Sequence, residues 1–368
     1  MPSPGIILLP WFLMTSPTVD IIVPVWNNPF ETRACLAAIL EHSADARLII
    51  VDNGSSRETE LMLEEFSEPL GEAGLFIKSE RNIGLVPAIN MGLARSDSDF
   101  AVIVRPHVMV CAGWLNALLG DAETVNAGIM SPMFTGKSAP ALPPLVPGCT
   151  LMESCTVSFS VLLLRGEMRI MAGGFDEQLD GGEWCLREYV RRTADKGYRT
   201  FITNRTVVAC GEEASFGSAA RRAEMINGSR IAYIARWGAA RDYVVYFGKE
   251  AQAGSLSDTV EAILDGARQG HHFTLLLHSR QYSDFRRMGW NGLHTGIELC
   301  GLSMLFPQRD LQKRVAALGK ELPDMVAVRG CEGVPFPGAD NAVSIGALME
   351  SISERSTNKQ TQSKEVSE

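Results

Sequence analysis

The chain has 368 residues, of which 46% are hydrophobic and 21% charged, a composition typical of a globular protein and not of a disordered or fibrous one. This length allows two domains. The formal net charge of −9, with no long block of Lys or Arg, argues against a nucleic-acid partner. The 8 cysteines form no CxxC pair, so the sequence indicates neither a zinc knuckle nor a dithiol motif, and we expect a reducing, cytoplasmic compartment.

Residues 1–18 are expected to be an irregular N-terminal segment. The stretch GIILLPWFLM (5–14) is apolar, but no Lys or Arg precedes it and it falls short of the ~20 residues that span a bilayer. Two interpretations remain open. Either Met14 is the true start, which the segment length favours, or the stretch is a weak surface anchor. We therefore expect at most peripheral membrane association, at the inner face of the membrane.

From Val19 onward, strand-like and helix-like patterns alternate. Short apolar, β-branched runs predict strands at 21–25, 48–51 and 101–104. Apolar stripes at helical spacing predict helices at 30–42, 56–66 and 86–93. This alternation with short connections predicts an α/β fold with a mostly parallel sheet, whose ligands bind beyond the carboxyl ends of the strands.

The later part of the chain predicts further elements. A Pro-rich loop is expected at 139–148, and a helix at 183–195 that ends before Gly197. A second helix, 218–237, is basic and amphipathic, and its predicted core stripe consists of Met225, Ile231, Ile234 and Trp237. Renewed alternation then predicts a small α/β unit. The expected domains are 19–238 and 239–354, followed by a polar, disordered tail at 355–368.

A polar turn follows the second predicted strand, with the sequence Asp52-Asn53-Gly54-Ser55-Ser56. Such a turn can present a carboxylate and backbone amides to a bound nucleotide. The same residue types also make ordinary turns, and either serine can cap the next helix. The turn by itself therefore leaves both interpretations open.

Several short motifs occur in a fixed order around this turn. They are Pro24-Val25-Trp26-Asn27, the Val51–Ser56 turn, Asn82 and Gly84 followed by Ala88, Asn90 and Gly92, then Gly113-Trp114-Leu115, GGFDE (173–177), GYR (197–199), SFG (215–217) and RWG (236–238). In this order, over residues 19–238, the chain resembles the family-2 glycosyltransferases of the GT-A fold. The resemblance implies transfer of a sugar from a nucleoside diphosphate sugar to a glycan, lipid-linked or protein acceptor, with inversion, as in polysaccharide biosynthesis.

The resemblance also implies which residues bind the donor. Asp52 and the Pro24–Asn27 segment would hold the base and ribose. The donor-binding residues expected in full are Pro24, Val25, Asn27, Asp52, Asn53, Gly54, Asn82, Gly84, Asn90 and Arg105.

Arg105-Pro106-His107 stands where the family carries acidic residues that hold Mn²⁺ or Mg²⁺ against the diphosphate. Hard cations prefer oxygen ligands, so an imidazole and a fixed cation here should weaken a metal site. Three interpretations remain. Arg105 replaces the metal as the partner of the diphosphate; His107 still ligates Mn²⁺; or the site has decayed and the domain is a catalytically silent binding or scaffold module.

The general base of an inverting transfer would remove the proton of the acceptor hydroxyl. The resemblance expects it in a Glu-Asp pair at the start of the 183–195 helix, and that pair is absent. Glu183 is the favoured candidate and Asp180 the second. An alternative role is structural, because Asp180-x-x-Glu183 has the spacing of a capping box for this helix.

Overall fold

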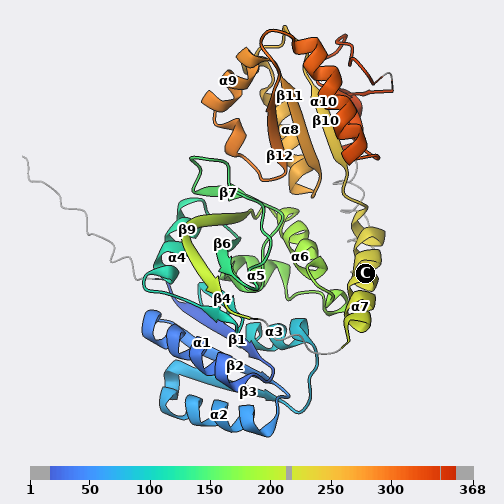
Figure 1. The fold of residues 1–368 in the computed structure, drawn as a ribbon. Coiled ribbons are helices and arrows are strands. Elements are labelled where there is room, and N and C mark those ends of the chain that lie inside the picture. The colour runs from blue at the N-terminus through green and yellow to red at the C-terminus, as the bar shows by residue number, and fades with distance from the viewer. Residues whose placement is uncertain (1–16, 213–217, 340, 354–368) are drawn as a thin grey trace, which may run out of the picture.

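The computed structural model describes residues 17–212, 218–339 and 341–353, which form two α/β units, each with its own sheet (Figure 1). The expectations for residues 1–16 and for the tail 355–368 lie outside the described residues. Within the described part, no helix is both long and apolar enough to cross a membrane.

The first unit is built on a nine-stranded sheet with the order β3-β2-β1-β4-β8-β6-β9-β5, and β7 pairs with β9. Its strands are β1 (Val19–Val25), β2 (Arg47–Asn53), β3 (Gly74–Ser79), β4 (Phe100–Val104), β5 (Val108–Met109), β6 (Ile129–Gly136), β7 (Leu151–Glu153), β8 (Val161–Arg165) and β9 (Thr200–Cys210). β1, β2 and β4 pair in parallel, as predicted; β3, which was not predicted, pairs in parallel with β2, and β8 runs antiparallel to β4.

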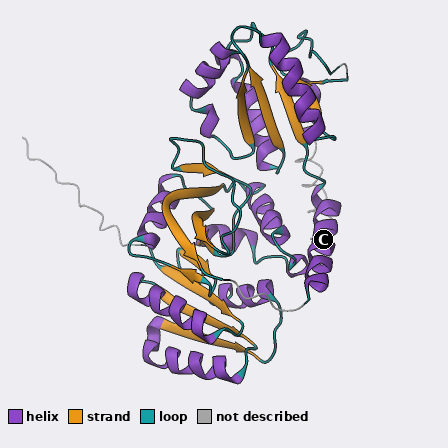
Figure 2. Ribbon diagram, in the orientation of Figure 1, coloured by secondary structure: helices purple, strands orange, loops and turns teal. Residues whose placement is uncertain are grey.

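Helices cover both faces of this sheet (Figure 2). They are α1 (Pro29–His42), α2 (Arg57–Ser67), α3 (Leu85–Leu93), α4 (Trp114–Thr124), α5 (Gly166–Ala172) and α6 (Trp184–Ala194), with α7 (Ala219–Trp237) outside α6. One core lies between the sheet and α1, α2 and α4, and the other between the sheet and α3, α5 and α6. Every residue of β1 is buried, because a parallel strand covered on both faces needs a continuous apolar run. The strand and helix predictions for this part are confirmed.

The second unit has a five-stranded parallel sheet with the order β12-β11-β10-β13-β14. Its elements are β10 (Asp242–Tyr246), α8 (Ser257–Arg268), β11 (His272–Leu277), α9 (Ser279–Arg287), β12 (Ile297–Gly301), α10 (Pro307–Glu321), β13 (Val326–Arg329), β14 (Val343–Ser344) and a helix at 345–353. The repeated α/β pattern is thus confirmed. α9 was not predicted, because its sequence is mostly polar and only two of its residues, Gln281 and Phe285, are buried.

A polar contact region joins the two units. The buried Glu153 carboxylate accepts hydrogen bonds from Arg268 Nε at 2.9 Å and Arg268 Nη2 at 3.0 Å. The backbone N–H of Thr295 donates to the Glu153 carbonyl at 2.8 Å, and its hydroxyl lies 3.0 Å from Ser154 Oγ. The end of β7 in the first unit is thus hydrogen-bonded both to α8 and to the 294–296 loop of the second unit. These bonds fix how the two units contact each other.

The predicted core stripe of α7 is partly wrong. Met225 and Ile231 are 47% and 56% exposed, and the buried residues of the helix are Ser229, Tyr233 and Trp237. These three residues are spaced by four, so they form one face that packs on α6. The sequence shows apolar residues on more than one side of α7, and only the position of α6 selects the buried side.

Candidate functional site

A cleft opens at the carboxyl ends of β1 and β4, where the strand order of the first sheet reverses. In open α/β sheets such a reversal leaves a crevice that binds ligands. The cavity has a volume of about 130 Å³. Its lining includes Pro24, Val25, Trp26, Asn27, Asn28, Glu31, Asn53, Asn82, Leu85, Arg105, Pro106, His107 and Glu212. The structure therefore brings seven of the thirteen predicted site residues together.

The end of β1 turns sharply through two residues in the left-handed region, Asn27 with φ 58° and Asn28 with φ 55°. Asn is among the few non-glycine residues that adopt this conformation at low cost. The Asn27 N–H donates to Ser55 Oγ at 2.9 Å, and Asn27 Oδ1 accepts from the Ser56 N–H at 2.8 Å. Asn27 thus connects the ends of β1 and β2 and shapes the mouth of the cleft.

The predicted turn after β2, residues 52–56, is held by specific hydrogen bonds. Asp52 is 1% exposed, and its Oδ1 accepts from the Ser55 N–H at 2.9 Å, while its buried Oδ2 has no hydrogen-bond partner among the described residues. Gly54 has φ 69°, and a Cβ there would lie 2.2 Å from the carbonyl carbon of Arg81, so only glycine fits. Asp52 does not line the cleft, and its bond to the Ser55 N–H fixes the turn that follows Asn53, which does.

Asn53 holds the next loop in place. Its Oδ1 accepts from the Ile83 N–H at 2.9 Å, and its Nδ2 donates to the Gly84 carbonyl at 2.9 Å and to Asn82 Oδ1 at 3.3 Å. Asn82 Oδ1 also accepts from the Gly84 N–H at 2.9 Å, and Gly84 has φ 105°. These three predicted residues therefore form one network at the start of α3.

Asn90 lies elsewhere, on the last turns of α3. Its Nδ2 donates to the Phe175 carbonyl and to Glu177 Oε1, both at 2.9 Å, and its Oδ1 accepts from the Phe175 N–H at 2.9 Å. All the polar groups of this side chain bond to the loop before α6. Asn90 does not line the cleft, and in this structure it fixes that loop against α3.

Arg105 and His107 form the opposite wall of the cleft, just after β4. The Arg105 N–H donates to the Ser160 carbonyl at 3.0 Å, which anchors the backbone to the turn before β8. His107 is 7% exposed, and its Nε2 lies 3.3 Å from Ser160 Oγ. Arg105 lines the same cleft as Asn27 and Asn53. Its guanidinium has five N–H donors in a planar fork.

The donor set here does not fit the Mn²⁺ or Mg²⁺ site of the family. No group of three or more His, Cys, Asp or Glu side chains among the described residues is arranged to hold a metal ion. A carboxylate is replaced by His107, and Arg105 places a positive charge in the same lining. Hard divalent cations prefer oxygen ligands, which Arg105 and His107 do not supply, although the carboxylates of Glu31 and Glu212 also line the cleft.

The predicted capping box at the start of α6 is absent. Asp180 Oδ1 accepts from the Val86 N–H at 3.2 Å, so its carboxylate caps α3, and Glu183 makes no capping hydrogen bond for α6. Burial raises the pKa of Asp180 above its ordinary value, although the backbone N–H groups of Val86 and Leu85 and the charge of Arg105 oppose the shift. Asp180 is therefore next to the cleft, because Leu85 lines it.

Glu183 is in a different environment. Its carboxylate is 50% exposed and pairs with Arg187 at 3.0 Å across the first turn of α6. It does not line the cleft. The two candidates for the general base therefore differ in their surroundings. Asp180 is a partly buried carboxylate beside the cleft, and Glu183 is an ion-paired carboxylate on the surface of α6.

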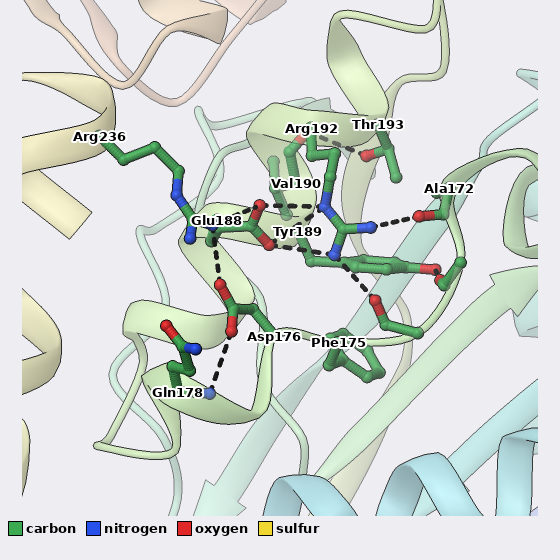
Figure 3. A network of polar contacts seen from close by, with 12 residues as sticks. Ala172, Phe175, Asp176, Gln178, Glu188, Tyr189, Val190, Arg192, Thr193 and Arg236 are labelled. Atoms are coloured by element: carbon green, nitrogen blue, oxygen red, sulfur yellow. Dashed lines mark hydrogen bonds and ion pairs between the residues drawn. The ribbon is translucent and has the colours of Figure 1, made fainter. Parts of the chain in front are cut away.

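A buried ion-pair network on α6 was missed from the sequence (Figure 3). Glu188 is 1% exposed, and Arg192 Nε and Nη2 donate to its carboxylate at 2.9 and 3.1 Å. Arg236 of α7 reaches the same carboxylate at 3.6 Å and Asp176 at 2.7 Å. The i, i+4 spacing of Glu188 and Arg192 is a signal for such a pair, although it does not distinguish a buried pair from an exposed one.

Comparisons with known proteins agree with this architecture. Residues 20–139 match the model of the family described as Glycosyl transferase family 2, which confirms the resemblance carried by the motifs. A sequence search of curated proteins finds no match.

Three solved structures are similar in fold. GalNAc-T7 with UDP, GalNAc and Mn²⁺ has 14% identity and a TM-score of 0.51, covering 60% of this chain and 48% of its own. A mannosyltransferase from Pyrobaculum calidifontis, in complex with GDP-Man and Mn²⁺, has 16% identity and a TM-score of 0.48, covering 60% and 65%. S. aureus TarS 1–349 has 12% identity and a TM-score of 0.46, covering 68% and 80%.

The first unit has the GT-A glycosyltransferase fold, as predicted. The chain spans less than two thirds of the length of two of these structures, 48% of GalNAc-T7 and 65% of the mannosyltransferase.

Proposed function

We propose that the first unit, residues 19–238, transfers a sugar from a nucleoside diphosphate sugar to an acceptor hydroxyl with inversion. The observation that carries this proposal is the polar cleft at the carboxyl ends of β1 and β4, within the segment that matches the glycosyl transferase family. The acceptor is a glycan, a lipid-linked sugar or a protein, as in polysaccharide biosynthesis. The second unit, 239–354, is a separate domain.

The ends of β1 and β2 bind the nucleoside in this proposal. Pro24, Val25, Asn27 and Asn53 line the cleft and would hold the base and the ribose. Asp52 acts in this proposal through the turn that it holds, because its Oδ1 accepts from the Ser55 N–H close to Asn53, which lines the cleft.

Arg105 carries the charge compensation. As the glycosidic bond breaks, negative charge develops on the leaving diphosphate. A fixed guanidinium stabilises this charge by donating two parallel hydrogen bonds to the phosphate oxygens. In this proposal the guanidinium takes the place of a metal ion, because Arg105 and His107 stand in the cleft where the family carries acidic residues. His107 stays in contact with Ser160 and supports the backbone of Arg105.

We assign the general base to Asp180 ahead of Glu183. Asp180 is beside the cleft, and its raised pKa makes it a better proton acceptor than an ordinary aspartate once it is ionised. It removes the acceptor proton while the hydroxyl attacks the anomeric carbon from the face opposite the diphosphate. Glu183 is already paired with Arg187.

The test is a calorimetric titration of UDP, dTDP and GDP into the full chain, each with Mn²⁺ and with EDTA, followed by a donor-turnover assay. We expect one diphosphate to bind with EDTA present and its affinity to fall in Arg105→Ala. Binding that needs Mn²⁺ and is lost in His107→Ala would overturn the metal-free mechanism. Binding without turnover, or no binding, would favour a catalytically silent module.

A further inference from the structure

A second cavity, of about 290 Å³, lies between the two units and shares no lining residue with the donor cleft. Its walls come from α6 and α7 of the first unit, and from the end of α8 and the 294–296 loop of the second. Four arginines line it, Arg187, Arg191, Arg230 and Arg268. None of its lining residues, in the part of the chain that the structure describes, is an aspartate or glutamate.

Two of these arginines are neutralised by carboxylates outside the cavity. Arg268 pairs with the buried Glu153 at 2.9 Å, and with Asp265 at 3.0 Å. Arg187 pairs with Glu183 at 3.0 Å. These contacts fix the two side chains at opposite sides of the cavity and account for their charges.

The charges of the other two arginines are not balanced by a protein carboxylate. Neither Arg191 nor Arg230 forms an ion pair within the described residues, and Arg230 only donates to Asn227 Oδ1 at 2.9 Å. Arg191 is 5% exposed, and its Nη1 donates to the Gln269 carbonyl at 2.9 Å. Arg191 is therefore a buried cation without a carboxylate partner among the described residues, an arrangement that an anion in the cavity would stabilise, whereas Arg230 is exposed to solvent.

Arg191 is also positioned to hold a ligand. Its guanidinium lies over the Trp237 ring, with the central carbon 5.0 Å from the ring centroid, which fixes its plane. Its buried Nε has no hydrogen-bond partner among the described residues. A planar, fixed guanidinium with an unused N–H matches the tetrahedral oxygens of a phosphate group.

His294 beside the cavity is a neutral hydrogen-bonding group. His294 Nδ1 accepts from the Gly296 N–H at 2.8 Å, and burial together with the charge of Arg268 lowers its pKa to about 3. His271 Nδ1 likewise accepts from the Arg241 N–H at 3.1 Å. Their arrangement leaves the positive charge of the cavity with the arginines.

We propose that the cavity between the two units binds a phosphorylated small molecule through Arg191 and Arg230. The anionic group pairs with the buried guanidinium of Arg191 and with the exposed guanidinium of Arg230. Trp184 and Tyr233, whose ring centroids are 5.3 Å apart, form an aromatic wall for the organic part of the molecule. The ligand contacts both units, and this inference does not depend on the proposed glycosyl transfer.

The experiment uses inorganic diphosphate as the probe and the full chain throughout. The donor cleft is first disabled with Arg105→Gln, and binding is measured by calorimetry. We expect this variant to retain one diphosphate site. Adding Arg230→Gln should weaken that site by about tenfold or more, because a charge-assisted hydrogen bond is lost. Arg230 is exposed, so this change leaves the core intact.

Arg33→Gln is the matched control, since Arg33 is an arginine on α1 that pairs with Glu65 far from the cavity. It should leave diphosphate affinity unchanged. In a thermal melt, diphosphate should raise the melting temperature of Arg105→Gln more than that of Arg105→Gln with Arg230→Gln. No diphosphate binding in Arg105→Gln, or binding that is the same with and without Arg230, would overturn the proposal.

Discussion

The two sheets have the same order in their parallel strands, and yet their carboxyl edges differ. In both, the first strand lies between the second and the fourth, as β2-β1-β4 and β11-β10-β13, so that each sheet has a point where the strand order reverses. After β1 this point is an open cleft lined by Asn27, Asn53 and Arg105. After β10 it is occupied by the side chain of Phe247, which is 0% exposed.

The difference depends on the residues that follow each strand. β1 is followed by Trp26 and then by two asparagines, Asn27 and Asn28, that adopt left-handed backbone. β10 is followed by Phe247, whose ring lies 2.4 Å from where a Cβ on Gly330 would be, so the glycine makes room for the ring. The same topology therefore supplies a binding crevice in one sheet and a packed core in the other.

Among the tests of this comparison, the largest change in the rate of sugar transfer is expected for substitution of Asp180, the proposed base beside the open cleft. We expect Asp180→Asn to lower the rate of sugar transfer by about 10²- to 10⁴-fold, the usual contribution of a general base, with little change in donor affinity. Steady-state kinetics with a separate binding titration measure both quantities. Glu183→Gln is the matched control and should leave the rate nearly unchanged. The opposite ranking of the two variants would return the role of base to Glu183.

The pH dependence of the same reaction is a second test of Asp180. Its pKa is raised, and the base acts in its ionised form, so the rate should rise with pH through this raised pKa and level off above it. A pH–rate profile of the wild type should show an acidic limb that Asp180→Asn loses. A limb that is unchanged in Asp180→Asn assigns the titration to another group.

Phe247→Ala tests the packed edge of the second sheet. Removing a fully buried aromatic side chain should reduce the free energy of unfolding by about 3–5 kcal/mol, because a cavity is left behind. Chemical denaturation measures this loss, and donor affinity should not change. Met304→Ala, at a position that is 79% exposed, is the control and should have little effect. A loss of donor binding in Phe247→Ala would mean that the second edge also takes part in the site.

Arg105→Gln tests the open edge of the first sheet. The affinity for a nucleoside diphosphate should fall by about 10- to 100-fold, because the hydrogen bonds to a charged group are worth about 1.5–3 kcal/mol. The affinity for the corresponding nucleoside should stay the same, since it has no phosphate. Equal losses for both ligands would show that Arg105 supports the shape of the cleft and does not bind the diphosphate.

The smallest effect is expected at the turn after β1. Asn27→Ala should destabilise the protein by about 1–2 kcal/mol, because alanine disfavours the left-handed conformation and the contact with the Ser56 N–H is lost. Asn27→Gly keeps the conformation and should destabilise it less. Denaturant melts of the two variants measure the difference. Equal losses would assign the whole effect to the hydrogen bond.

Much of the fold could be predicted from the sequence because it follows from local patterns. The buried runs of β1, β2 and β4 and the apolar stripe of α1 each depend on residues close in the chain. The turn at Gly54 could also be predicted, since a strand followed by Asn, Gly and Ser must turn. Rules of α/β topology then locate the cleft at the carboxyl ends of these strands.

The partners of the polar side chains could not be predicted in this way. Asp180 has the spacing to cap α6, but it caps α3, because the loop before α6 packs against the start of α3. Asn90 belongs to a family motif, and its amide bonds to the same loop. Both outcomes depend on which elements meet in space.

The sequence by itself determined the order of strands and helices, the polar turns at the strand ends and the altered Arg105-Pro106-His107 position. The tertiary structure alone decided which carboxylate lies beside the cleft, which side of α7 is buried, and that Arg191 and Arg230 share one cavity with Arg268. The physical reason is that burial patterns are encoded over a few neighbouring residues, whereas an ion pair or a cavity is formed by residues that only long-range packing brings together.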